Sequence, residues 1–146
     1  MSTTRDLARE QANKDRVSDA FAAWAAGTGG PFALLAATAT WTIVGNSPVS
    51  RTYGSRDEFI EVVIDPFNAR MSEPLVPDVR HVFADGDWVV VLFDGRATAR
   101  DGQPYRNTYT WYMRFDDRGA EAEIVEVIAF FDTIEFTDFW NRVSPA

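Results

Sequence analysis

One stretch of alternating side chains, residues 105–115, places the strongest constraint on the fold of this chain. In a β-strand, every second side chain points to the same face of the sheet. One face of this strand would carry Tyr105, Asn107, Tyr109, Trp111 and Met113, and the other would carry Arg106, Thr108, Thr110, Tyr112 and Arg114. Ligand pockets are mostly apolar, with a few polar groups. Because the first face mixes aromatic rings with an amide and hydroxyls, we expect it to line a cavity on a curved sheet.

The first half of the chain predicts helices. Apolar residues at helical spacing indicate a long first helix that runs through Ala26 and is stopped by the Gly-Thr-Gly-Gly run that follows. Pro31 opens a short second helix, since proline is tolerated in a first turn. Ser55 and Glu58 form a capping-box pattern at the start of a third helix, which Pro66 is expected to bend or end.

Strands dominate the rest of the chain. A strand rich in β-branched residues is predicted at 38–44, between the second and third helices. The later strands are predicted at 76–84, 88–99, 105–115 and 123–131, and a short terminal helix at 133–143. Helices followed by a meander of antiparallel strands indicate an α+β fold.

Composition excludes several classes of protein. A chain of 146 residues suits one domain, expected to span 1–146. There is no cysteine for a disulfide or thiolate metal site, and the single histidine, His81, excludes a multi-histidine metal centre within one subunit. A formal net charge of −8 argues against nucleic acid and anionic membrane surfaces as partners. We expect no cofactor.

The sequence also predicts a compartment. No apolar run approaches the length of a membrane span. The N-terminal residues Arg5, Asp6, Arg9 and Glu10 interrupt any apolar core of a signal peptide. We therefore expect a soluble, cytoplasmic protein.

Five segments together resemble nuclear transport factor 2-like proteins: 41–48, 53–59, 84–87, 105–109 and 130–133. This superfamily, also described as cystatin-like, includes ketosteroid isomerases, SnoaL-like polyketide cyclases and limonene epoxide hydrolases. The resemblance implies a cone-shaped barrel, in which a strongly curved antiparallel sheet wraps around the N-terminal helices and encloses a deep pocket. It also implies a homodimer formed through the outer face of the sheet. That face would carry Thr108, Thr110, Tyr112 and Ile128.

The ketosteroid isomerase residues are missing. The position of the general-base carboxylate falls near Thr42, and that of the oxyanion-hole tyrosine at Ala20 or Phe21. The protonated aspartate of that family falls at Trp111. None of these side chains can abstract a proton or hold an enolate.

The epoxide hydrolase residues are incomplete. Asn46 and Asp94 match two of its five positions, whereas the other three hold Val44, Leu92 and Ala129. Its mechanism needs one carboxylate to activate water and another acid to protonate the epoxide, so the two matches cannot sustain it.

The register that the resemblance implies puts Leu92, Asp94, Arg96 and Thr98 on the pocket side of their strand. On this interpretation Asp94 is the general base, with Arg96 and Tyr109 as electrophilic partners. The substrate would be bound by Asn46, Asn107, Trp111, Phe131 and Trp41. The alternative is that Asp94 and Arg96 form a solvated structural pair at the pocket mouth.

Two further residues have open interpretations. His81 could be a general acid or base, or a core or interface histidine, and without a visible partner carboxylate we favour the structural role. Asp132 is more easily explained as a cap of the terminal segment than as a catalytic acid.

Three functions fit these observations. The first is a cofactor-free acid/base enzyme, such as an isomerase, cyclase, hydratase or dehydratase, acting on an apolar polycyclic or terpenoid-like substrate. The second is a non-catalytic protein that binds a hydrophobic small molecule in the same pocket. The third is a dimeric accessory domain whose outer sheet face binds another protein.

Overall fold

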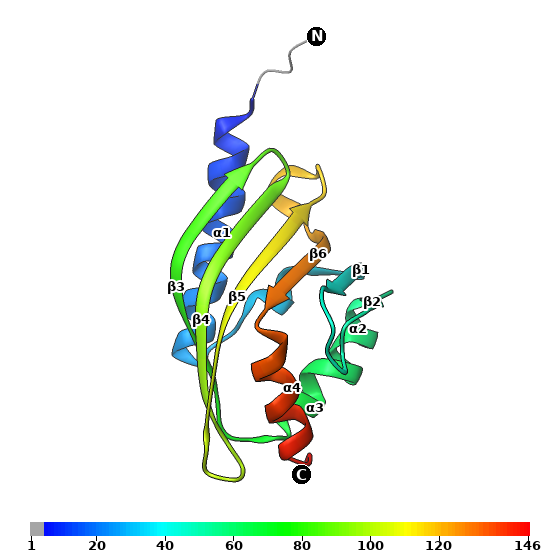
Figure 1. The fold of residues 1–146 in the computed structure, drawn as a ribbon. Helices are drawn as coiled ribbons and strands as arrows, with labels where there is room; N and C mark the ends of the chain where they lie inside the picture. The colour runs from blue at the N-terminus through cyan, green and yellow to red at the C-terminus, as the bar shows by residue number, and fades with distance from the viewer. Residues whose placement is uncertain (1–4) are drawn as a thin grey trace.

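A computed structural model describes residues 5–146 as a long helix lying along a strongly curved six-stranded sheet (Figure 1). The first helix, α1, is Leu7–Ala26. The strands are β1 (Leu35–Ile43), β2 (Thr52–Tyr53), β3 (Met71–Asp85), β4 (Trp88–Ala99), β5 (Pro104–Phe115) and β6 (Ile124–Phe131). Their order across the sheet is β2-β1-β6-β5-β4-β3. The predicted α+β fold with a strand meander is confirmed.

One strand pair departs from the expected antiparallel sheet. Strands β3 to β6 form an antiparallel meander, and β2 is antiparallel to β1. Strand β1, however, lies parallel to β6, with Trp41 opposite Val127 and Ile43 opposite Ala129. The sheet is therefore mixed, and it stays open between its edge strands β2 and β3.

Local signals set the helix boundaries. The side chain of Asp6 caps the N-terminus of α1 by accepting a hydrogen bond from the backbone of Arg9, and Gly27 ends the helix at a φ of 76°. This left-handed conformation favours glycine because it has no Cβ. A single 3₁₀ turn, Pro31–Leu34, follows, and β1 begins directly after it.

The third predicted helix is not a single α-helix. It consists of α2 (Arg56–Phe59), a π-helical turn (Ile60–Ile64) and α3 (Asp65–Asn68). Ser55 caps it as predicted, with its hydroxyl accepting from the backbone N–H of Glu58. Pro66 does not end this helical segment: it follows the π-helical turn directly, at the start of α3.

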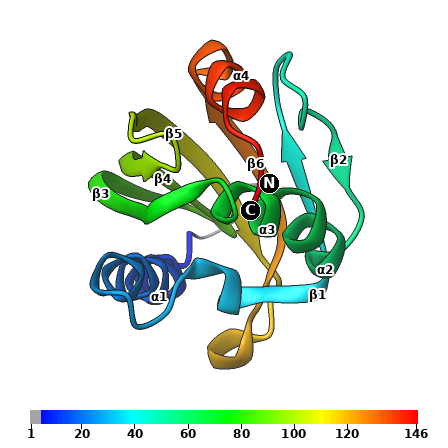
Figure 2. The ribbon, with the colours of Figure 1, turned by 90° about the horizontal axis from the view of Figure 1, so that it is seen from below.

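The terminal helix α4, Thr133–Arg142, begins where β6 ends. The carboxylate of Asp132 accepts hydrogen bonds from the backbone N–H groups of Ile134 and Glu135, so the predicted capping role of Asp132 is confirmed. Figure 2, a view from below, shows α3 near the centre of the wide end of the cone, with α1 and α4 on either side of it.

The faces of β5 are those that its alternation predicts. The inward residues are all buried: Tyr105, Asn107, Tyr109, Trp111, Met113 and Phe115. Arg106, Thr108 and Tyr112 are exposed on the opposite, outer face. The concave face therefore holds the core beneath α1, and the convex face is open.

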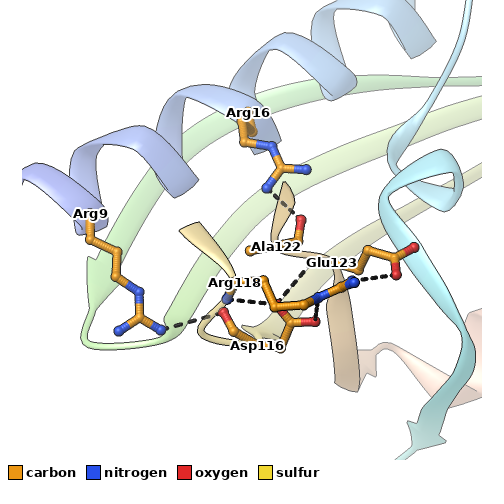
Figure 3. A network of polar contacts seen from close by, with 6 residues as sticks. All are labelled: Arg9, Arg16, Asp116, Arg118, Ala122 and Glu123. Carbon is orange, nitrogen blue, oxygen red and sulfur yellow. Dashed lines mark hydrogen bonds and ion pairs between the residues drawn. The ribbon is translucent and has the colours of Figure 1, made fainter. Parts of the chain in front are cut away.

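Arginine side chains fasten α1 to the connection between β5 and β6 (Figure 3). Arg16 donates to the carbonyl oxygen of Ala122 at 2.6 Å, and Arg9 donates to that of Asp116 at 3.4 Å. Within the connection, Arg118 pairs with Asp116 and Glu123. These contacts connect α1 to the end of the sheet that lies away from α4.

Within residues 5–146, no helix is both long and apolar enough to cross a membrane.

Candidate functional site

The wide end of the cone holds a partly open cavity of about 400 Å³, between the concave sheet face and the helices α2, α3 and α4. Nine of its lining residues are aromatic: Trp24, Phe32, Trp41, Phe59, Phe67, Tyr109, Trp111, Phe131 and Phe136. The others are Ile43, Val63, Ile64, Met71, Pro74, Leu75, Ala129, Asn68 and Ser72. The volume is in the range of small-molecule sites.

Four of the aromatic residues, each from a different element, form a continuous set of ring contacts in the cavity wall. The rings of Trp41 on β1 and Phe59 on α2 are stacked, with centroids 4.1 Å apart. Trp111 on β5 meets Trp41 edge-on at 4.9 Å and stacks on Trp24 of α1 at 5.8 Å. Because these rings contact one another, the apolar wall is preorganised.

No lining residue within the described part of the chain is Asp, Glu, His, Lys or Arg. The residues of the lining that carry polar side-chain groups are Tyr109, the three tryptophans, Asn68 and Ser72. Ser72 is already within hydrogen-bond distance of the carbonyl oxygens of Thr98 and Ala99, both at 3.2 Å. The cavity wall therefore offers hydrogen-bond donors and no strong base.

A buried hydrogen-bond chain lies behind one side of this wall. The hydroxyl groups of Tyr105 and Tyr109 are 2.8 Å apart, and the Asn107 amide donates to Tyr105 at 2.9 Å. Burial raises the pKa of Tyr105 to about 12 and raises that of Tyr109 well above its ordinary value. Both phenols are therefore neutral donors at physiological pH.

Gly95 allows Tyr109 to lie close to β4. A Cβ at this glycine would come within 3.0 Å of the Tyr109 ring and 2.9 Å of the Leu75 side chain. The ring stacks on the neighbouring Phe93, with centroids 4.9 Å apart. Phe93 and Gly95 thus fix the position of the phenol in the wall.

The structure brings together four of the predicted site residues. Trp41, Tyr109, Trp111 and Phe131 all line the cavity. Their placement follows from the inward faces of β1, β5 and β6, and their roles in binding or catalysis stay predictions.

The expected position of Asp94 and Arg96 in the pocket is wrong. Both side chains lie on the outer face of β4, together with Leu92 and Thr98, because Phe93 and Gly95 occupy the inner face. Directly paired residues share a face, and Phe93 pairs with the inward Tyr109. A one-residue error in register reverses every side chain of a strand.

Asp94 pairs with Arg80 instead of Arg96. Two hydrogen bonds of 2.7 and 2.8 Å join the carboxylate to Arg80, and the Thr108 hydroxyl donates to it at 2.7 Å. These bonds, that from Arg80 first, hold the pKa of Asp94 below its ordinary value. The Asp94 side chain is 38% exposed, so it is solvated as in the alternative interpretation, but its partner is Arg80 and not the Arg96 of that interpretation.

Three further residues lie outside the cavity. Asn46 is exposed in the bend after β1. Asn107 is buried next to Tyr105 and does not line this cavity; it lines a second, more open hollow, which Asp94 and Arg96 also line. His81 is exposed on β3, where its ring stacks on the exposed Phe83 at 5.6 Å. No group of three or more metal-binding side chains is found in the described residues 5–146.

Some residues of the cavity wall are not among those predicted from the sequence. Phe136 comes from α4, and Met71 and Leu75 come from the start of β3, which precedes the predicted strand. The signal for Phe136 was available: Phe136, Phe139 and Trp140 lie at helical spacing after the Asp132 cap.

The chain belongs to the SnoaL-like domain family. The sequence model of that family matches residues 17–127, which include α1 from its middle and nearly all of the sheet. No curated protein sequence matches the chain.

Solved structures with the same fold share little sequence with the chain. Bal32a, from a soil-derived mobile gene cassette, is 17% identical with a TM-score of 0.72, covering 90% of this chain and 98% of its own. An NTF2-like protein from Burkholderia pseudomallei is 21% identical with a TM-score of 0.70, covering 88% and 96%. A protein from Jannaschia sp. CCS1, provisionally assigned as a SnoaL-like polyketide cyclase, is 18% identical with a TM-score of 0.69, covering 92% and 94%. At these identities the likeness shows the nuclear transport factor 2-like fold alone.

Proposed function

We propose that this protein binds an apolar, ring-containing small molecule, polycyclic or terpenoid-like, in its aromatic cavity. The observation that carries the proposal is the set of nine aromatic residues around a volume of about 400 Å³, without a charged side chain in the lining of the described chain. Filling such a wall with a flat apolar ligand removes apolar surface from water and adds ring contacts.

Fluorene, a flat three-ring hydrocarbon, is a suitable probe because the cavity tryptophans report its binding by fluorescence. Ala129 faces the cavity from the C-terminal half of β6, so Ala129→Phe would fill part of the volume with a ring. We expect this variant to weaken fluorene binding at least about tenfold, since a ligand excluded from its pocket loses most of its buried area.

The matched control is Ile128→Phe, which adds a ring at the neighbouring position on the outer face. It should leave fluorene affinity unchanged. Circular dichroism and thermal unfolding would establish that both variants fold. Equal affinity of wild type and Ala129→Phe, or no saturable binding by wild type, would contradict the proposal.

A second candidate is isomerase or cyclase chemistry of the SnoaL-like kind. Membership of that family supports it, as does a neutral phenol, Tyr109, at the cavity wall, where it could polarise a carbonyl group. Since the lining holds no strong base within the described residues, the base would have to come from the ligand or from water.

Hydrogen–deuterium exchange next to the carbonyl of 2-tetralone, followed by NMR, tests this candidate. Catalysis predicts faster exchange with wild type than with buffer, and loss of most of the acceleration in Tyr109→Phe. Binding of 2-tetralone without acceleration would favour the non-catalytic interpretation.

We also propose that the outer sheet face joins two copies of the chain. Phe83, Tyr112 and Phe130 are large apolar residues exposed on this face, at 57, 38 and 44%. In an isologous dimer the same surface of both copies forms the contact, so these three residues would be buried in each copy. Sedimentation at micromolar concentration should give a dimer for wild type and a monomer for Phe130→Glu, and a wild-type monomer would refute the assembly.

We also propose that the protein is located in the cytoplasm.

A further inference from the structure

The amide of Asn107 can adopt only one orientation, because backbone groups surround it. Its Oδ1 accepts from the backbone N–H groups of Thr108 at 2.8 Å and Asp132 at 3.0 Å. Its Nδ2 donates to the carbonyl oxygen of Asp132 at 3.0 Å. A flipped amide would point hydrogen atoms at two backbone donors. The second hydrogen of Nδ2 must therefore go to the Tyr105 hydroxyl, 2.9 Å away.

This orientation determines the direction of the next hydrogen bond. Tyr105 is fully buried, and within residues 5–146 its hydroxyl bonds only to Asn107 and Tyr109. Because Asn107 can only donate to it, the Tyr105 proton must be donated to the Tyr109 oxygen. The reverse direction would leave the Tyr105 proton buried without an acceptor, which buried polar groups rarely tolerate.

Tyr109 is therefore left with a free donor. Its oxygen accepts from Tyr105, its own proton has no partner among the described residues, and its side chain lines the cavity. A chain of hydrogen bonds that all point one way also polarises its last member. Asn107 and Tyr105 thus orient the hydroxyl of Tyr109, whose side chain lines the cavity.

We infer that the cavity selects ring compounds carrying a neutral carbonyl group, such as a ketone or quinone, whose oxygen accepts a hydrogen bond from Tyr109. This inference rests on the proposed function and names the chemistry of its ligand. A carboxylate or phosphate would fit poorly, because a buried anion needs a paired cation and the lining holds none within the described residues.

Fluorene and 9-fluorenone test the inference, since they share one skeleton and differ by a carbonyl group. The quantity to compare is the ratio of the two affinities, which cancels changes in cavity shape. We expect Tyr109→Phe to lower the preference for fluorenone about fivefold, as for the loss of one hydrogen bond. Infrared spectra of bound fluorenone should show a carbonyl stretch lowered in wild type and restored in Tyr109→Phe.

Tyr112→Phe is the matched control, because it removes one hydroxyl from the outer face of the same strand. The affinity ratio and the carbonyl stretch should both equal those of wild type.

Asn107→Asp tests the direction of the chain. The introduced carboxylate can still accept from the two backbone N–H groups but cannot donate to Tyr105. The Tyr105 proton would then turn to this carboxylate, Tyr109 would donate to Tyr105, and the donor would leave the cavity. The infrared shift should disappear while fluorene still binds. If this variant fails to fold, Tyr105→Phe should still reduce the shift by removing the polarising partner.

The outcomes separate the two proposals. If both probes bind and Tyr109→Phe keeps the wild-type ratio or the lowered carbonyl stretch, the inference is overturned and the proposed function stands. A retained lowering of the stretch would then assign the donor to another polar group of the lining, a tryptophan, Asn68 or Ser72. If neither probe binds wild type, the proposed function fails and the inference fails with it.

Discussion

The polar groups on the two faces of the sheet formed by β3, β4 and β5 differ in their burial. On the inner face, Asn107 and Tyr105 are buried and every hydrogen-bonding group of Asn107 has a partner. On the outer face, Asp94 and Arg80 form a pair that is 38% and 52% exposed. Buried polar groups must be fully paired, whereas water can replace the partners of exposed ones. The inner network can therefore impose direction on a proton, and the outer pair cannot.

The side chains of β4 and β5 that can contact a molecule in the cavity lie on the inner face. In the sequence, Asp94 and Arg96 suggested a catalytic pair, yet Asp94 faces away from the cavity. The phenol of Tyr109, without a charge, holds the position from which a ligand can be contacted. Substitutions should therefore affect ligand binding only on the inner face.

The largest expected effect is on the free energy of unfolding, which should fall for a substitution on the inner face and not for one on the outer face. Trp111→Ala removes a buried ring that contacts Trp24 and Trp41, and it should lower the free energy of unfolding by about 3–5 kcal/mol. Arg106→Ala, at an exposed outer position of the same strand, should change it by less than about 0.5 kcal/mol. Urea denaturation measures both. Equal losses would mean that the two faces are not energetically distinct.

Alkaline pH should weaken the inner face specifically. The pKa of Tyr105 is raised to about 12 in the folded protein, while the unfolded chain ionises near pH 10. Its contribution is complete below pH 10 and declines as pH rises towards 12, because the unfolded state releases a proton that the folded state keeps. The loss is about 2.7 kcal/mol for two pKa units.

Denaturant midpoints measured across this range, together with tyrosinate absorbance, would follow the alkaline effect. Tyr105→Phe should show a shallower decline than wild type. The same decline in both proteins would assign the alkaline effect to other groups.

An intermediate effect is expected at the junction of the inner network with α4. Asp132→Ala removes the cap from the first turn of the helix and should cost about 1 kcal/mol. The backbone of Asp132 also bonds to Asn107, so fraying of this turn should raise amide exchange at Asp132. Unchanged stability would indicate that packing of Phe136 alone holds the helix start.

The smallest effect is predicted for Asp94→Asn. The residue is on the outer face, so fluorene binding and any exchange of 2-tetralone should equal those of wild type. Stability should change less than in Asp132→Ala, because solvent screens exposed ion pairs. A marked loss of binding or turnover would restore Asp94 as a functional residue and break the distinction between the faces.

Local sequence signals predicted much of the fold. The caps at Ser55 and Asp132 depend on contacts within a few residues, and both are present. The alternation of β5 was equally informative, because one face holds large rings and the other holds arginines and threonines. These features determined the element order and the residues of β5 that face inward.

The face of β4 could not be determined in this way. Residues 89–93 are Val-Val-Val-Leu-Phe, so both faces of the strand are apolar and alternation gives no choice. This ambiguity arises because the outer face of β4 is apolar here as well as the inner face. Pairing of Phe93 with Tyr109 resolves it, since partners across a strand pair share a face.

The sequence by itself determined the helices, the strand meander and the aromatic character of the inner wall, because each depends on neighbours in the chain. The tertiary structure decided the parallel pairing of β1 with β6, the outward turn of Asp94 and the enclosure of the cavity by Phe136 of α4. It also decided the direction of the Asn107–Tyr105–Tyr109 chain, which depends on the backbone of Asp132, 25 residues away from Asn107. Contacts between distant segments set register, burial and proton position, and no local pattern encodes them.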